Sequence, residues 1–203
     1  MPLVGDRREV GVRNRPASTF VVVAATAALF LVAGVVATVA SDEQAARPEQ
    51  VQRREAVDYL TAVEPLARDA GRVIQLGMKP GVEELRQERR SAGALARAAA
   101  SWERETLDVR DRWRDVDPPP ELVAAHETFL RALEGYAATA ATLGAAAQAP
   151  RSERSQLLDE AVAGGERSDD VWDEAAAQVQ GHLRALGEPT VTWLPGGTPA
   201  QSP

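Results

Sequence analysis

The stretch LVAAHETFLRALEGYAATAATL, residues 122–143, decides the fold of this chain. Aliphatic and aromatic side chains recur through it at alternating spacings of four and three residues, as they do along the buried face of an α-helix. The stripe that they form consists of Leu122, His126, Phe129, Leu133, Tyr136, Ala140 and Leu143. A helix with such a stripe is stabilised by burying it against other helices, so the stretch predicts one member of a helical bundle.

Comparable stripes predict helices on both sides of this stretch. The first begins near Pro48 and ends at the GMKPG sequence of residues 77–81. We expect a kink or a break at Pro65 inside it, because proline lacks a backbone donor and crowds the preceding turn. The next segment covers about residues 82–116 and stops at three consecutive prolines, residues 118–120.

Two further points along the pattern are places where a helix can be interrupted. Ser91 and Gly93 can divide the second segment into a short helix ending at residue 90 and a longer one. In the last segment, about residues 152–186, the Gly164-Gly165 pair costs about 2 kcal/mol relative to two alanines, so it marks either a break or a close helix contact. Because no segment alternates as a strand does, we expect an all-α fold: an antiparallel, up-down-up-down four-helix bundle over residues 48–187.

Ahead of the bundle, the sequence FVVVAATAALFLVAGVVATVA at residues 20–40 predicts a transmembrane helix over residues 19–40. At 1.5 Å per residue, 21 residues span roughly 30 Å, the thickness of a bilayer's hydrocarbon core. Four arginines precede the span and two acidic residues follow it, so the N-terminus is predicted to be cytoplasmic and the bundle extracytoplasmic. The predicted order is a cytoplasmic basic tail, residues 1–18, the span, a linker, residues 41–47, the bundle, and a disordered tail, residues 188–203.

The chief alternative for the N-terminal segment is a cleaved signal peptide. Thr38-Val39-Ala40 is a passable cleavage context, but signal-peptide apolar regions usually run about 7–15 residues and this one is longer. The uncleaved span makes the lipid bilayer the first predicted partner. Small residues four apart, Ala24/Ala28 and Gly34/Thr38, are compatible with a homo-oligomer formed through this helix.

Charge and cysteine content exclude several classes of partner and chemistry. Residues 41–203 carry 19 basic and 28 acidic side chains, a net charge of −9, which repels a phosphate backbone and makes nucleic acid an unsuitable partner. The chain contains no cysteine, so it has no disulfide framework and no thiolate nucleophile.

The two histidines are the natural candidates for a metal site. His126 lies on the stripe of its predicted helix, and His182 follows Val179 by three residues on the last one. Neither has a glutamate three residues before it, as the di-iron bundle pattern requires, and no HExxH motif is present. We therefore expect both to be structural, with no metal or other cofactor bound.

The four tryptophans are candidates either for core residues or for a ligand-binding cleft. Trp102, Trp113 and Trp172 have the spacing of core residues, so we expect them to fill the interior of an alanine-rich bundle. The competing interpretation is an aromatic-lined cleft between helices for an apolar ligand. Trp193 falls outside every stripe and is expected to be a contact residue in the tail.

Charged clusters in the helices are interpreted as solvent-exposed faces. Calcium loops need a turn that a helix does not provide, so one acidic group is expected to be solvated; it comprises Asp169, Asp170, Asp173 and Glu174. A second group alternates in sign and predicts an exposed, salt-bridged surface; it comprises Asp108, Arg110, Asp111, Arg112, Arg114 and Asp115.

Four short sequence segments carry a resemblance to a group of known proteins: GMKPG at 77–81, PPPELVAAHETF at 118–129, EGYAATA at 134–140, and GERSDDVWDEAAAQVQGHLRALG at 165–187. Over residues 50–188 the chain resembles membrane-anchored or exported helical proteins of high-GC Gram-positive bacteria, a group without a characterised member. The resemblance implies a location in the cell envelope and supplies no catalytic residue.

These features together predict a membrane-anchored, single-pass, non-enzymatic module that binds an envelope protein or ligand outside the membrane. No Ser/His/Asp set, glycine-rich phosphate loop or nucleophile elbow is present, so we expect no catalytic residues. One alternative is the input domain of an envelope sensor, which would need a separate membrane partner because the inner tail is so short. Another is a secreted helical protein, if the N-terminal segment is cleaved.

Overall fold

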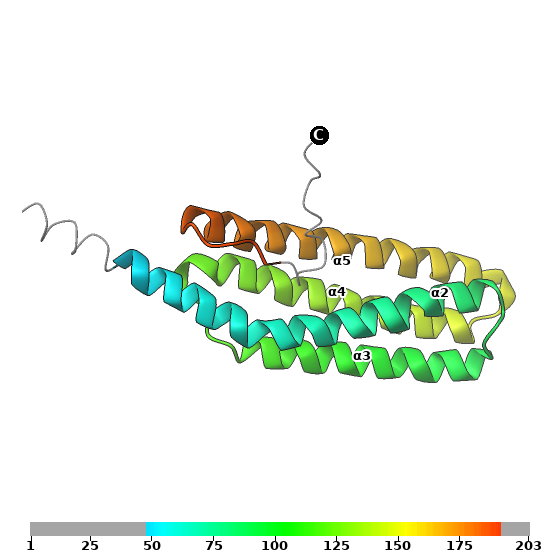
Figure 1. Cartoon of the computed structure of the whole chain (residues 1–203). Helices are drawn as coiled ribbons and strands as arrows, with labels where there is room; N and C mark the ends of the chain where they lie inside the picture. The colour runs from blue at the N-terminus through cyan, green and yellow to red at the C-terminus, as the bar shows by residue number, and fades with distance from the viewer. Residues whose placement is uncertain (1–47, 192–203) are drawn as a thin grey trace, which may run out of the picture. The chain divides into compact units, whose positions relative to one another are not determined.

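Four helical rods lie side by side in the computed structural model, which describes residues 48–191 (Figure 1). The first rod is helical throughout residues 48–86: an α-helix over 48–72, a π-helical turn at Val73–Met78, and α2 at Lys79–Arg86. The others are α3 (Ala92–Arg114), α4 (Val123–Gln148) and α5 (Arg151–Ala185), with a 3₁₀ turn at Pro120–Leu122 leading into α4. The all-α prediction is confirmed, since the described residues contain four helices and no strand.

Contacts at the two ends of the bundle establish an antiparallel, up-down-up-down order. At one end Gln52 of the first rod donates to Glu121 before α4, and Arg53 pairs with Glu188 after α5. At the other end Arg151, which begins α5, pairs with Glu88 just after the first rod. Short connections of this kind place successive helices next to one another in opposite directions.

The predicted stripe of α4 forms the centre of the core. All seven of its residues, including His126, are at most 5 % exposed. Against it pack Trp113 of α3 and Trp172 of α5, whose rings contact Phe129 with centroid distances of 5.0 and 4.8 Å. Aromatic rings at such distances and tilts add to the stability that their buried area provides.

The first rod corrects one boundary of the sequence analysis and excludes one of the two alternatives at Pro65, a kink or a break. The helix is continuous through Pro65, so there is no break; this proline is exposed, so water can bind the carbonyl that its ring leaves unpaired. The expected stop at residues 77–81 is wrong, because the helix runs on to Arg86. Here the Lys79 N–H donates to the Ile74 carbonyl in a widened π turn, which relieves the crowding that Pro80 would cause in an ordinary α-helix.

Glycines in this part of the first rod permit a close approach by α3. A Cβ atom on Gly77 would lie 2.6 Å from Nε1 of Trp102, and one on Gly81 would lie 2.6 Å from Cη2 of the same ring. The rod ends instead at residues 87–91, where Glu88 takes a left-handed conformation with φ of 50° and Ser91 caps α3. The expected break at Ser91 is therefore confirmed, but residues 82–86 belong to the first rod and form no separate short helix that ends at residue 90.

In α5 the Gly164-Gly165 pair marks a close contact between helices and not a break. A Cβ on Gly164 would lie 3.0 Å from Oγ1 of Thr139 in α4, and α5 is continuous through both glycines. Beyond α5, the Val191 carbonyl accepts a hydrogen bond of 2.7 Å from Gln180. Ordered contacts therefore extend past residue 187, where the disordered tail was predicted to begin.

No helix within residues 48–191 combines the length and the apolar character that crossing a bilayer requires. The predicted span at 19–40, its flanking segments 1–18 and 41–47, and Trp193 all lie outside the described residues.

Candidate functional site

A groove of about 430 Å³ opens between the first rod and α5, with α4 beneath it. We call it the lateral groove. Its walls are mainly aliphatic, with Ile74, Met78, Val82, Leu143, Ala161, Val162 and Gly165 among the lining residues. Charged side chains line it as well; they are Lys79, Glu83, Arg86, Glu166 and Asp169. An apolar surface with a few charged groups around it is typical of small-molecule sites.

Small residues on α5 and the π turn of the first rod leave this space open. Ala161 and Gly165 present little or no side chain to the groove, and a Cβ on Gly165 would meet only Thr139, at an ordinary contact distance of 3.7 Å. On the facing rod, Ile74 and Met78 belong to the π turn and are 6 % and 4 % exposed. Turns of this type recur at functional sites, because the extra residue per turn displaces side chains from the regular helical pattern.

A polar cluster closes one end of the lateral groove. The Tyr136 hydroxyl donates a 2.6 Å hydrogen bond to Oδ1 of Asp169, and Nζ of Lys79 lies 3.4 Å from Oδ2 of the same carboxylate. Burial raises the pKa of Tyr136 well above its ordinary value, and the bond to Asp169 adds to the rise. The hydroxyl therefore remains protonated, and so a hydrogen-bond donor, at neutral pH.

Next to this cluster a smaller hollow of about 160 Å³ adds Gln75, Trp172 and Asp173 to the lining. It shares Lys79, Tyr136 and Asp169 with the groove, so the two spaces meet at the polar cluster. Partial burial raises the pKa of Asp173, and repulsion from Asp169 and Asp170 adds to this effect, while Lys79 opposes it.

Ion pairing leaves the rim of the groove and hollow with a negative excess. Arg86 binds Glu83 at 2.8 Å, and Lys79 pairs with Asp169. Glu166 and Asp173, which lie on α5 on either side of Asp169, make no ion pair within the part of the chain that the structure describes. Two cations and four carboxylates therefore line this region, and the excess lies along the α5 edge.

The histidines lie elsewhere and serve different roles. His126 is buried at the end of the bundle, where Nδ1 lies 3.2 Å from the Tyr59 hydroxyl. Burial lowers the pKa of His126 and raises the pKa of Tyr59 to about 12. The Trp113 indole opposes the rise at Tyr59, although it approaches the hydroxyl without hydrogen-bonding geometry. His182 is partly exposed. Nowhere in residues 48–191 do three His, Asp or Glu side chains gather as metal ligands would.

The tryptophans divide between core and contact roles. Trp113 and Trp172 are 0 % and 2 % exposed, which confirms them as core residues. Trp102 is partly buried and packs against two hydrophobic clusters of the core. The lateral groove has one aromatic lining residue, Tyr136, beside aliphatic and charged side chains, so it is not the tryptophan-lined cleft of the competing interpretation.

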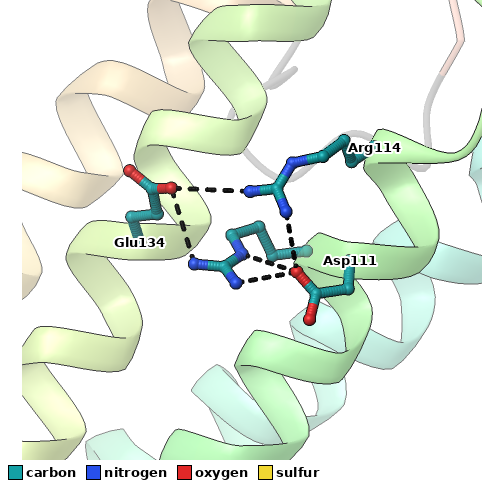
Figure 2. Close-up of polar contacts among 4 residues, drawn as sticks. Asp111, Arg114 and Glu134 are labelled. Carbon is teal, nitrogen blue, oxygen red and sulfur yellow. Dashed lines mark hydrogen bonds and ion pairs between the residues drawn. The ribbon is translucent and has the colours of Figure 1, made fainter.

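The alternating charges of α3 form ion pairs that connect three helices. Figure 2 shows Arg114 between Asp111 of its own helix and Glu134 of α4, with N–O distances of 3.1 and 3.8 Å. Arg110 pairs with the same two carboxylates, and its hydrogen bond to Asp111 is the main reason why the pKa of that carboxyl is lowered. On the other side, Arg112 reaches Asp69 of the first rod at 3.0 Å. The salt-bridged surface is confirmed for these residues.

The acidic cluster is a solvated face at Asp170, Asp173 and Glu174, which are exposed as expected. The Asp169 side chain is 40 % exposed, and its carboxylate also binds Tyr136 and Lys79. Lys79 is the sole lysine among the 23 basic residues, and this is the one feature of the sequence that marks it as a candidate site residue. Tyr136 belonged to a predicted stripe, which concealed that its hydroxyl reaches a charged partner.

Comparison of the chain with models of known protein families, with curated proteins and with solved structures finds no match.

Proposed function

We propose that this chain is a membrane-anchored, extracytoplasmic binding module whose helical bundle holds an apolar small molecule in the lateral groove. The observation that carries the proposal is the groove itself: a space of about 430 Å³ with aliphatic walls and a hydrogen-bonding end. This volume falls within the range of about 300–1,000 Å³ that is typical of ligand pockets. The apolar sequence of residues 20–40 supports the anchor.

The chemistry of the lining supports binding without catalysis. Tyr136 donates to Asp169, and Lys79 pairs with the same carboxylate, so the polar groups of the groove are engaged with one another. The remaining wall is aliphatic and offers dispersion contacts and burial, which stabilise an apolar ligand by about 25 cal/mol for each Å² removed from water.

Photo-crosslinking in membranes tests the proposal with the whole chain. Full-length protein in phosphatidylcholine vesicles is irradiated with a diazirine-bearing twelve-carbon alcohol, and labelled residues are mapped by mass spectrometry. We expect labels on residues 74–86 and 161–165. Gly165→Leu should reduce labelling at least fivefold, because the new side chain occupies the groove.

The matched control is Gly181→Leu in the same helix. A Cβ on Gly181 has no neighbour within 4 Å and the residue does not line the groove, so labelling should be unchanged. Labels spread evenly over the bundle, or labelling insensitive to Gly165→Leu, would contradict the proposal.

A further inference from the structure

The row of carboxylates on α5 distinguishes one edge of the lateral groove from the other. Glu166, Asp169 and Asp173 are spaced by three and four residues, so they follow one face of the helix over roughly 10 Å. Two of the three have no ion-pair partner within residues 48–191, while the two cations that line the groove from the opposite rod, Lys79 and Arg86, are already paired.

We infer that the ligand of the lateral groove is a cationic amphiphile: an apolar chain that lies in the groove and an amine head that binds the Asp169–Asp173 end. This inference rests on the proposed function and specifies its ligand. Charge complementarity carries it, because the region has four carboxylates and two cations. An anionic head would meet a net repulsive rim, and an uncharged head would gain no attraction from the excess of negative charge.

The geometry places the two parts of such a ligand. The groove of about 430 Å³ and the hollow of about 160 Å³ meet at Lys79, Tyr136 and Asp169, so a chain in the first can present its head to the second. Within the hollow, Asp173 and Oδ2 of Asp169 are the available acceptors, since Oδ1 of Asp169 already accepts from Tyr136. An ammonium group donates up to three hydrogen bonds and matches an acceptor pair of this kind.

Lys79 does not occupy the place of the ligand's amine. Its Nζ lies 3.4 Å from Oδ2 of Asp169 without forming a hydrogen bond, and its side chain is 51 % exposed. Partial burial raises the pKa of Asp173, and repulsion from Asp169 and Asp170 adds to the rise although Lys79 opposes it. A second cation relieves that repulsion.

A series of three probes with one chain length tests the inference. Diazirine-bearing twelve-carbon amine, alcohol and carboxylate are crosslinked to full-length protein in phosphatidylcholine vesicles at pH 7.4. For each probe, labelling of residues 74–86 and 161–173 is compared between protein variants in identical vesicles, so that partitioning of the probe into lipid cancels.

The ratio of wild-type to Gly165→Leu labelling, in which partitioning of the probe cancels, should be about tenfold larger for the amine than for the carboxylate, with the alcohol in between. Asp173→Asn and Glu166→Gln should each reduce amine labelling about threefold and leave alcohol labelling unchanged. Glu174→Gln removes the same charge from the exposed surface of α5 outside the groove, and it should leave all three probes unaffected.

Each contrary result has a distinct meaning. Equal ratios for the three probes overturn the amine preference and leave groove binding intact. Loss of alcohol labelling in Asp173→Asn also overturns the inference, because the carboxylate would then be maintaining the groove's shape. Absence of labelling with every probe overturns the inference and the proposed function together.

Discussion

Replacing Gly81 by alanine should destabilise the bundle, although alanine is the better helix former. Gly81 lies in α2, where a Cβ atom would come within 2.6 and 2.8 Å of two carbons of the Trp102 ring. Non-bonded carbons normally keep about 3.5–4.0 Å apart, so the ring would have to retreat by roughly 1 Å. Trp102 contacts both hydrophobic clusters, and its displacement would disturb packing on each side.

Two opposing terms set the magnitude. Gly→Ala in a helix interior gains about 1 kcal/mol, while overpacking of this kind costs typically 1–3 kcal/mol. We therefore expect Gly81→Ala to lower the free energy of unfolding by about 1 kcal/mol. With Trp102→Ala already present, the clash is gone, and the same substitution should raise the free energy of unfolding by about 1 kcal/mol. The sign reversal corresponds to a coupling of about 2 kcal/mol.

Urea unfolding of the full-length protein in detergent micelles, followed by circular dichroism at 222 nm, measures all four corners of this cycle. Gly71→Ala is the matched control, because a Cβ there has no neighbour within 4 Å. It should be stabilising to the same extent with and without Trp102. If Gly81→Ala stabilised the wild-type protein as much as Gly71→Ala does, Trp102 would not dock on the glycines and the account of the continuous first rod would be refuted.

Three further expectations address polar groups. Tyr136→Phe should lower the free energy of unfolding by about 1 kcal/mol in urea titration, because it removes a hydrogen bond to a half-exposed carboxylate. Burial lowers the pKa of His126, so below pH about 6.5 the unfolded chain binds a proton that the native state does not. The free energy of unfolding should therefore fall as the pH decreases from 7, and this part of the loss should disappear in His126→Gln. Urea midpoints measured across this pH range for both proteins test the expectation. Glu134→Gln should cost less than about 1 kcal/mol at low salt and nothing measurable in 1 M NaCl, since Glu134 and its partner Arg114 are about half exposed (Figure 2).

The helices of the bundle could be predicted because their signal is local. Each stripe repeats within one segment, and the seven residues from Leu122 to Leu143 are buried as their spacing predicted. The stop at residues 118–120 also followed from local chemistry, since consecutive prolines cannot continue α3. The ion pairs of Arg110 and Arg114 with Asp111 were likewise visible as neighbours in sequence.

The errors arose where a distant residue outweighs local preference. Glycine and proline at residues 77–81 are poor helix formers, and by that rule the first rod should have ended there. The ring of Trp102, about 20 residues further along the chain, packs where only glycine leaves room, so the tertiary contact favours helix at these positions. Nothing in the local sequence indicates which glycine ends a helix and which one leaves room for an aromatic ring to pack against the helix.

The lateral groove was not predictable for a related reason, and a comparison of two glycines explains it. Gly81 and Gly165 both lie within helices of the bundle. The space above Gly81 is filled by Trp102, whereas Gly165 borders the groove and its missing Cβ would meet nothing closer than Thr139. A large side chain therefore packs against the helix surface at Gly81, and none packs against the surface at Gly165. A well-packed core fills such space, so the open surface at Gly165, next to the acidic edge of α5, is where an external apolar group would complete the packing.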